Sequence, residues 1–378
     1  MVPNPHLAYF VHDVTDAAVV RRVQMLHAGG MKVTVLGFRR RGGIIATIDG
    51  AEVVDLGLTG DGRLLHRAWA IARTMVGFGQ VRARILDADV LMARNLEMLA
   101  LAARARGRRR LVYECLDIHR LLLGTSVTSQ FIQRIERALL KRVDLILTSS
   151  QRFAEDYFRP RHGSNTPMLL IENKVLAIDG GSLPERSNPI IAGPPWVIGW
   201  FGMLRCRRSL EQLIALVRGS GGGIQVVLAG IPSDKEFSDF DAQVDAEPGM
   251  RFLGTYSPRD LPQLYAKVHF AWAIDYFEEG LNSTWLLPNR LYEAMANGAV
   301  PIALSSVETG NWLARNGVGI VVDDAPEALP GILAKLREEP FAGYRASVNA
   351  LPRSVLETRQ TECDQLADAI VSGVLPPG

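Results

Sequence analysis

Short apolar runs alternate with helical segments along almost the whole chain, and this alternation limits the fold more than any other feature. Residues 7–11 form an apolar run typical of a strand buried on both faces, followed by a predicted helix over 14–29 and a strand over 32–38. Strand, helix and strand at this spacing make a βαβ unit, the building block of parallel sheets. Further strands are predicted at 88–93, 111–114, 144–149, 168–172, 196–201, 224–229, 251–254, 268–274, 300–304 and 319–322. Further helices are predicted at 62–84, 95–105, 129–142, 150–158, 208–218, 258–267, 326–338 and 353–371. The predicted fold class is therefore α/β, with doubly wound parallel sheets.

A stretch rich in Gly, Pro and Ser divides this series into two halves. It covers residues 179–196, and a second run of alternating strands and helices begins after it. The length of 378 residues also fits two domains. We place the boundary between an N-terminal domain of residues 1–182 and a C-terminal domain of residues 183–352.

Charge is spread unevenly over the two halves. Residues 1–180 carry 26 Lys and Arg against 17 Asp and Glu, whereas the remainder carries 16 against 23. The basic half is expected to meet an anionic partner. Its basic stretches around 39–41, 104–110 and 134–142 could contact anionic lipid, or they could form a solvated face. Nucleic acid is not expected, because no recognition motif or interleaved aromatic residues accompany the arginines.

The cysteines and the N-terminus indicate in which cellular compartment the protein is expected. Cys115, Cys206 and Cys363 are far apart and odd in number, which favours neither a disulfide framework nor a metal site. The first residues lack the pattern of a signal peptide, and no apolar run is long enough to span a bilayer. We expect a cytoplasmic protein and leave open its peripheral attachment to the inner face of the plasma membrane.

The stretch 278–304 has the features of an anion site. Pro288 suits the first turn of a helix, Gly298 suits its end, and the apolar run 300–304 follows as a strand. A loop that leads into a helix N-terminus can bind a diphosphate, and Glu293, one turn into the helix, could accept hydrogen bonds from sugar hydroxyls. The alternative is an ordinary βα unit in which Glu293 complements the helix dipole.

Four stretches of the second half together resemble the nucleotide-sugar domain of GT-B glycosyltransferases of the family-four type, which are common in bacterial polysaccharide assembly. They are Gly199–Gly202 with Arg205, Arg207 and Arg208; Val226–Gly230; Arg251–Gly254 with Leu261–Tyr265; and Pro288–Pro301. The first half agrees more loosely, at Ala88–Val90, Tyr113–Glu114, the Asp117 region, Val143–Ile146 with Ser149, and Glu172–Lys174. The resemblance implies the GT-B architecture, two Rossmann-like domains facing a central cleft, the first binding the acceptor and the second the donor. It also implies that the C-terminal helix, about 353–378, packs back on the first domain.

The resemblance further implies a hexosyltransferase-type enzyme. The donor would be a UDP-sugar or GDP-sugar, and the acceptor a glycan or a lipid-linked oligosaccharide in polysaccharide biosynthesis. Transfer in such enzymes is typically retaining and needs no metal or other cofactor. Asp87-Ala88-Asp89 spells the DxD metal motif of the other glycosyltransferase fold, but Asp89 begins a predicted buried strand, and a structural role is expected.

The matched positions assign roles to individual residues. Glu293 corresponds to the glutamate that binds the ribose hydroxyls, and Arg208 falls on the basic phosphate-binding position. Relatives often carry two glutamates with seven residues between them; Glu293 matches the second, and Trp285 stands in this chain at the position of the first, while many relatives have Arg where this chain has Met203. Arg205 is a candidate to replace that Arg, and Asn282 and Ser283 are candidates to contact the donor sugar or its phosphates. The remaining donor-site candidates are Gly202, Asn289 and Arg290.

Asp117 and His119 are the candidate catalytic or acceptor-contacting residues. They follow the strand at 111–114, at its carboxyl end, and a His there can exchange a proton near neutral pH. The alternative is a His that only completes the wall of its domain. Two other functions also remain open, a sugar-nucleotide epimerase of the same fold and a non-catalytic nucleotide-sugar or glycan-binding member. The sequence leaves the base, the donor sugar, the acceptor, the linkage, the stereochemistry and the oligomeric state undetermined.

Overall fold

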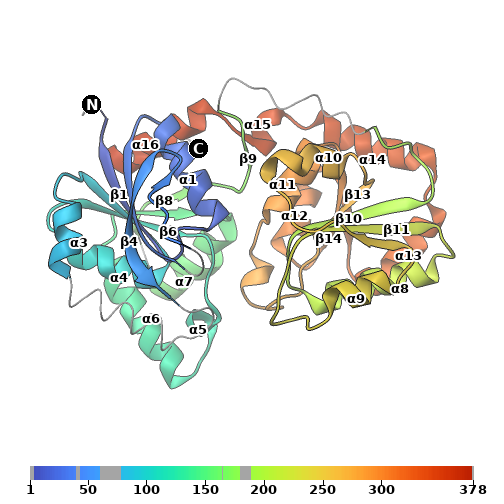
Figure 1. Cartoon of the computed structure of the whole chain (residues 1–378), viewed down its shortest axis with the longest axis horizontal. Helices are drawn as coiled ribbons and strands as arrows, with labels where there is room; N and C mark the ends of the chain where they lie inside the picture. Colours follow the sequence, from blue (N-terminus) through green and yellow to red (C-terminus); the bar gives the residue numbers. More distant parts are fainter. Residues whose placement is uncertain (1–3, 40–42, 60–77, 164, 179–188, 377–378) are drawn as a thin grey trace. The chain divides into compact units, whose positions relative to one another are not determined.

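Figure 1 shows the computed structural model of the chain, which describes residues 4–39, 43–59, 78–163, 165–178 and 189–376. The chain folds into two compact units. Unit 1 comprises residues 1–172 and 358–378, and unit 2 comprises residues 173–357. The chain therefore passes between the units at 172/173 and again at 357/358, whereas the sequence suggested 182/183 and about 352/353. The Gly- and Pro-rich stretch on which the first of those suggestions rested lies largely outside the described residues, at 179–188.

Unit 1 is built on an eight-stranded sheet with the order β3-β4-β2-β1-β5-β6-β7-β8. All neighbouring strands are parallel except the short hairpin pair β3 and β4. The strands are β1 (His6–Val11), β2 (Lys32–Arg39), β3 (Thr47–Ile48), β4 (Ala51–Leu58), β5 (Val90–Arg94), β6 (Arg110–Cys115), β7 (Leu145–Thr148) and β8 (Met168–Leu170). The helical segments are α1 (Ala17–Ala28), α3 (Phe78–Arg84), α4 (Leu96–Ala105), α5 (Arg120–Leu123), α6 (Val127–Leu140), the π-helix η1 (Phe153–Phe158), α7 (Arg159–His162) and α16 (Gln360–Ser372).

Unit 2 is built on a six-stranded, fully parallel sheet with the order β12-β11-β10-β13-β14-β15. This order reverses direction between β10 and β13, as in doubly wound folds that bind nucleotides at such a switch point. The strands are β10 (Trp196–Leu204), β11 (Ile224–Pro232), β12 (Met250–Phe252), β13 (Phe270–Trp272), β14 (Val300–Leu304) and β15 (Ile320–Val322). The helices are α8 (Arg207–Gly219), α9 (Phe240–Asp245), α10 (Leu261–Tyr265), α11 (Asn289–Ala296), α12 (Glu308–Asn316), α13 (Ala325–Lys335), α14 (Glu338–Ala350) and α15 (Arg353–Leu356), with 3₁₀ turns η2 (Pro258–Asp260) and η3 (Asn282–Thr284). A separate two-stranded sheet pairs β9 (Val175–Leu176) with β16 (Glu357–Thr358).

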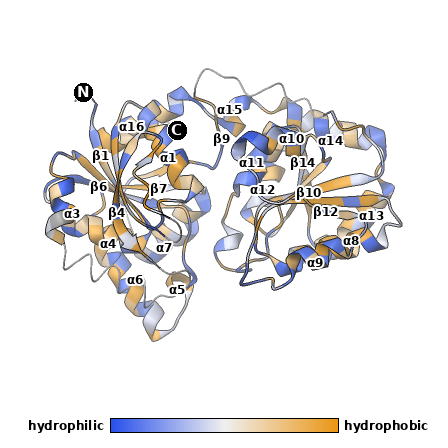
Figure 2. Ribbon diagram, in the orientation of Figure 1, coloured by the Kyte–Doolittle hydropathy of each residue, from blue (hydrophilic) through white to orange (hydrophobic). Residues whose placement is uncertain are grey.

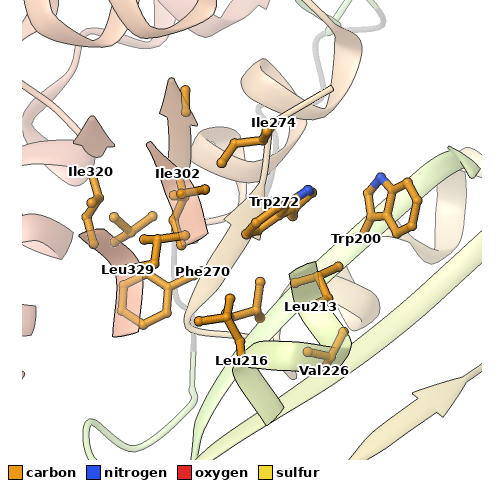
Figure 3. Close-up of a cluster of buried hydrophobic side chains, with 14 of the residues drawn as sticks. Trp200, Leu213, Leu216, Val226, Phe270, Trp272, Ile274, Ile302, Ile320 and Leu329 are labelled. Atoms are coloured by element: carbon orange, nitrogen blue, oxygen red, sulfur yellow. The ribbon is translucent and has the colours of Figure 1, made fainter. Parts of the chain in front are cut away.

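Large apolar side chains from the strands fill the core of unit 2. Trp200 on β10 and Phe270 and Trp272 on β13 are almost fully buried, and Leu213 and Leu216 of α8 pack against them (Figure 3). Burying one such side chain contributes about 1.5–3 kcal/mol. Figure 2 shows hydrophobic residues along the strands and hydrophilic residues on the outer faces of most helices.

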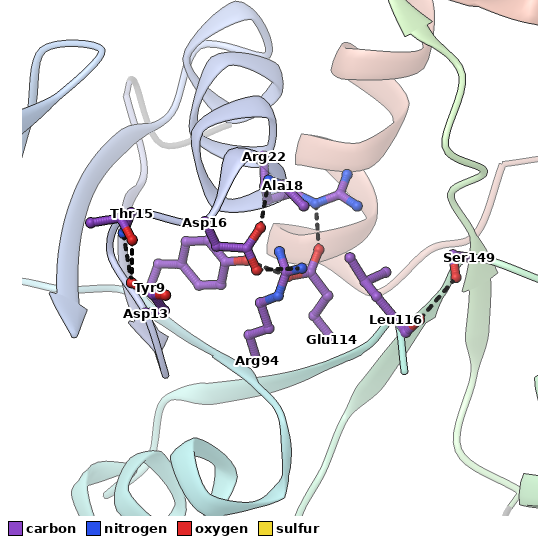
Figure 4. A network of polar contacts seen from close by, with 10 residues as sticks. All are labelled: Tyr9, Asp13, Thr15, Asp16, Ala18, Arg22, Arg94, Glu114, Leu116 and Ser149. Carbon is purple, nitrogen blue, oxygen red and sulfur yellow. Dashed lines mark hydrogen bonds and ion pairs between the residues drawn. The ribbon is translucent and has the colours of Figure 1, made fainter. Parts of the chain in front are cut away.

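A buried ionic network ties α1 to the strands of unit 1 (Figure 4). Glu114, at the end of β6, accepts a hydrogen bond from Arg22 of α1 at 2.6 Å and another from the hydroxyl of Tyr9 on β1. Arg94 of β5 lies 3.9 Å from the same carboxylate and 3.3 Å from Asp16, which caps α1. Burial by itself raises the pKa of Glu114, but the two guanidinium groups and the hydrogen bonds outweigh it and hold this pKa below its ordinary value.

The structure confirms the predicted fold class, and it differs from the sequence prediction in several elements. Strand β4 and the helices α9, α12 and α14 were not predicted. The single helix expected over 353–371 is two helices, α15 and α16, because the chain is extended at β16 between them. Most of the helix expected over 62–84 lies outside the described residues, which begin again at Phe78. Among the described residues, no helix has both the length and the apolar character needed to cross a bilayer.

Candidate active site

Unit 2 contains a cavity of about 260 Å³ beside the sheet. It lies where β10 and β13 end and where the N-terminus of α11 begins. The lining residues are Phe201, Gly202, Met203, Arg205, Tyr256, Ala273, Asp275, Ser283, Leu286, Pro288, Asn289, Arg290, Glu293, Val307 and Thr309. The carboxyl ends of parallel strands are the usual place for ligands in such sheets.

Two glycines let β10 and β11 approach each other at the cavity. Gly202 and Gly230 are register partners, with backbone φ of +113° and +135° respectively. A Cβ atom on Gly230 would lie 1.8 Å from the carbonyl oxygen of Gly202, so no side chain fits there. Gly202 itself lines the cavity and leaves its backbone open to a ligand.

Three residues predicted from the helix signature gather at the start of α11. Pro288 is the N-cap, and Asn289, Arg290 and Glu293 all line the cavity. The Nη1 atom of Arg290 is buried and has no hydrogen-bond partner within the protein. The free N–H groups of the first turn and this guanidinium together favour a negatively charged ligand, and Glu293 adds an acceptor for hydroxyl groups.

The structure separates the two arginines that were candidates for phosphate binding. Arg205 lines the cavity, where its guanidinium lies 3.7 Å from Asp275 and 4.6 Å from the ring centroid of Phe277. Arg208 is not part of the lining. It donates to Glu279 at 2.8 Å and lies over the ring of Tyr276 at 4.0 Å.

The loop before α11 contributes one of its two predicted residues. Ser283 lines the cavity, and its hydroxyl donates to the carbonyl of Glu278 at 2.8 Å. Asn282 is buried and lies outside the lining. Trp285, which stands where relatives often have glutamate, is also outside the lining.

Sequence reasoning missed several lining residues, of which Tyr256, Asp275 and Thr309 are polar. Tyr256 follows the predicted strand at 251–254, and its hydroxyl faces Gly202. Burial, with the negative charge of Glu293, raises the pKa of Tyr256, so this phenol stays protonated and can donate a hydrogen bond. The sequence signal that could have identified Tyr256 was its place two residues after Gly254. The signal for Asp275 was weaker, and it consisted of its place directly after a predicted strand.

Asp117 and His119 belong to unit 1, whereas the residues that line the cavity belong to unit 2. Both are exposed, just after β6. His119 is the N-cap of α5, and its Nδ1 atom accepts a hydrogen bond from the backbone N–H of Leu121 at 3.3 Å. The geometry thus gives His119 a capping role.

The described part of the chain has no cluster of three or more His, Cys, Asp or Glu side chains placed to hold a metal ion. Asp87 and Asp89, which form the DxD spelling, take part in local contacts instead. Asp87 lies 3.1 Å from His6 and 3.3 Å from Lys32, and Asp89 accepts a hydrogen bond from the backbone N–H of His6 at 2.8 Å. These contacts agree with the structural role expected for the motif.

Comparison with known proteins identifies the family. Residues 16–174 match the family model described as "Glycosyl transferase 4-like domain". The chain is 44% identical over 371 residues to the succinoglycan biosynthesis protein ExoL of Rhizobium meliloti (strain 1021), covering 95% of this chain and 92% of that protein. The chain belongs to the GT-B glycosyltransferases of the family-four type. The resemblance inferred from the motifs is confirmed, and so is the expectation of a glycosyltransferase.

Solved structures support the fold assignment. HepE from Anabaena, crystallised with UDP and glucose, is 17% identical and superposes with a TM-score of 0.71 over 98% of this chain and 100% of that chain. WaaG, a glycosyltransferase involved in lipopolysaccharide biosynthesis, is 13% identical with a TM-score of 0.66 over 97% of this chain and 100% of that chain. At these identities the likeness concerns the GT-B fold.

Proposed function

We propose that this glycosyltransferase moves a hexose from a nucleoside-diphosphate donor to a growing exopolysaccharide. The observation that carries the proposal is the convergence of Glu293, Arg290 and Arg205 on one cavity at the N-terminus of α11. This set offers an acceptor for ribose hydroxyls beside two cations for a diphosphate. The 44% identity to a succinoglycan biosynthesis protein supports exopolysaccharide as the product.

The donor is a UDP-sugar in this proposal, with a GDP-sugar as the alternative. HepE, which shares the fold, was crystallised with UDP and with UDP-glucose. As the glycosidic bond breaks, negative charge develops on the leaving diphosphate. Guanidinium groups and helix N–H donors that are already in place stabilise this charge without reorganising. Transfer is retaining and proceeds without a metal cofactor in this scheme, with the leaving phosphate itself accepting the proton of the acceptor hydroxyl.

Unit 1 binds the acceptor in this scheme. Asp117 and His119 are its candidate contacts, because both are exposed at the carboxyl end of β6. The acceptor is a glycan or a lipid-linked oligosaccharide, which brings the enzyme to the inner face of the plasma membrane. Arg208 and Asn282 remain proposed donor contacts, although neither lines the cavity in the structure.

Donor binding by the cavity is tested by calorimetry with UDP on the wild type and on Glu293→Gln. A hydrogen bond to a charged group contributes about 1.5–3 kcal/mol, so the variant should bind UDP roughly 10- to 150-fold more weakly. Glu327→Gln is the matched control, because Glu327 likewise lies near the start of a helix, in the first turn of α13, but is exposed and outside the cavity lining. Equal affinity of wild type and Glu293→Gln, with the control also unchanged, would contradict the proposed site.

A further inference from the structure

Helix α6 of unit 1 carries a row of apolar side chains on its exposed face, although other apolar residues of the helix, such as Leu140, are buried. Val127, Phe131 and Ile135 recur every four residues and are exposed by 85%, 60% and 38%. The opposite face buries the polar residues Ser129 and Glu136 beside Leu140, and these three are exposed by 2%, 0% and 3%. A helix that only packs on its own domain keeps its exposed face polar.

The buried face is occupied by polar contacts that fix the helix in place. Glu136 accepts a hydrogen bond from the hydroxyl of Tyr157 in η1 at 2.5 Å. Gln133 donates to the carbonyl oxygens of Leu122 and Gly124, each at 2.9 Å. The outward direction of the apolar row is therefore set by specific contacts, because turning the helix over would break them and bury the exposed row in their place.

Basic side chains border the apolar row. Arg134 and Arg137 lie beside it on α6, and Lys141 and Arg142 follow the end of the helix, all of them exposed. Glu136 is the one acidic residue of α6, and it is buried. An apolar row with cationic neighbours and no exposed acid on the same helix is complementary to the surface of an anionic bilayer.

Another basic stretch of unit 1 is engaged within the fold. Arg106 pairs with Asp144 at 2.8 Å, Arg109 donates to the carbonyl of Ala88 at 2.7 Å, and Arg110 donates to the carbonyl of Ile370 at 3.2 Å. These guanidinium groups join loops and strands and link β6 to α16. Among the cations that border α6, Arg137 also donates within unit 1, to the carbonyl of Arg161 at 3.2 Å, but as a group these exposed cations are better placed than the other stretch to meet an external surface.

We propose that α6 docks the protein on an anionic lipid surface, with Val127, Phe131 and Ile135 entering the headgroup region and the neighbouring Arg and Lys side chains contacting lipid phosphates. Figure 1 shows α6 with α5 at the edge of unit 1. This inference rests on the membrane contact in the proposed function and names the surface that makes it. It does not depend on which sugar is transferred.

The test is co-sedimentation of the purified full chain with vesicles of phosphatidylcholine containing phosphatidylglycerol. The wild type should bind them, and raising the salt concentration should weaken binding because the cationic contribution is screened. Phe131→Gln combined with Ile135→Gln should lower the partition coefficient at least about tenfold, since two apolar side chains are withdrawn from the interface. Both positions are exposed, so the fold should be retained.

The matched control is Leu58→Gln combined with Leu86→Gln, which removes two exposed apolar side chains elsewhere in unit 1. Its binding should equal that of the wild type. A wild type that stays in the supernatant, or an α6 variant that binds as well as the control, would overturn the inference. So would a wild-type dimer in size-exclusion chromatography that the α6 variant abolishes, since a second copy would then cover the row.

Calorimetry with UDP on the same proteins separates the two proposals. UDP affinity should be the same in the wild type and both double variants, because the substitutions lie in unit 1 and the cavity in unit 2. Vesicle binding without UDP binding would leave α6 as a lipid contact and remove the donor site. UDP binding without vesicle binding would support the donor site and overturn the proposed lipid contact of α6.

Discussion

Replacing Arg205 and Arg208 separately by Gln ranks the two cations proposed for the leaving diphosphate. Arg205 lies in the cavity with its guanidinium fixed between Asp275 and Phe277. It is thus in position before the reaction and needs no reorganisation as charge develops. Arg208 is already neutralised by Glu279 at 2.8 Å and lies outside the lining.

The expected effects differ by at least an order of magnitude. Removing one pre-positioned donor to a developing negative charge costs about 2.7–4 kcal/mol, or roughly 10²–10³-fold in kcat. Removing Arg208 breaks an exposed ion pair with a contribution of about 0–1 kcal/mol, so kcat should fall less than about tenfold. The asymmetry follows from position, since both arginines have a carboxylate partner but Arg205 alone of the two lines the cavity.

Steady-state release of the nucleoside diphosphate at saturating donor measures both variants. Urea denaturation serves as the control for folding, and both variants should unfold near the wild-type midpoint because neither arginine is buried. A loss in Arg208→Gln equal to or larger than that in Arg205→Gln would refute the reasoning from cavity geometry. Such a result would indicate that Arg208, which occupies the family's phosphate-binding position, contacts the phosphate although it lies outside the cavity lining.

Three further outcomes follow from the contacts of single residues. Glu114→Gln removes the charge that compensates buried Arg22 and Arg94, and urea denaturation should show a loss of about 3–5 kcal/mol near neutral pH. Because folding lowers the pKa of Glu114, its contribution is present above the unfolded value of about 4.3 and is lost as the pH falls through the folded value, so wild type and variant should converge in acid. Gly230→Ala places a Cβ atom against the Gly202 carbonyl, and both the thermal midpoint and UDP affinity should fall, whereas Gly222→Ala, which meets no atom within 4 Å, should cost only its backbone strain. Trp285→Glu restores the residue common in relatives, but the side chain lies outside the cavity, so UDP affinity should change less than about threefold, as measured by calorimetry.

Local signals explain why the donor helix could be predicted from the sequence. Pro288 before the first turn and Gly298 at the end, with φ of +74°, mark the limits of the helix. Once these limits are known, Glu293 is recognised as a candidate because it lies one turn into the helix. Helix α12 has a weaker signal, because Gly317 with φ of +64° marks its end but Val307, which has no side-chain cap, stands at its start. Its Gly310 lowers helix propensity, and the reason for glycine there is tertiary, because a Cβ would lie 1.9 Å from the carbonyl oxygen of Leu304.

Long-range contacts explain what the sequence did not reveal about the site. Arg205, in the loop after β10, and Arg208, in the first turn of α8, are only three residues apart, and their partners Asp275 and Glu279 lie about seventy residues further along the chain. The outward apolar face of α6 was equally hidden, because a periodic pattern shows that a helix is amphipathic and does not show which face is buried. Tyr157, which is distant on the chain, fixes that orientation through Glu136.

Dependence of donor turnover on an acceptor tests the central claim most directly. The purified chain is incubated with UDP- and GDP-hexoses, with and without lipid-linked oligosaccharides extracted from polysaccharide-producing cells, and the products are analysed by mass spectrometry. A transferase should release nucleoside diphosphate only when acceptor is present, with the acceptor gaining the mass of one hexose. Conversion of the donor into an epimer without acceptor, or donor binding with no turnover under either condition, would contradict the account.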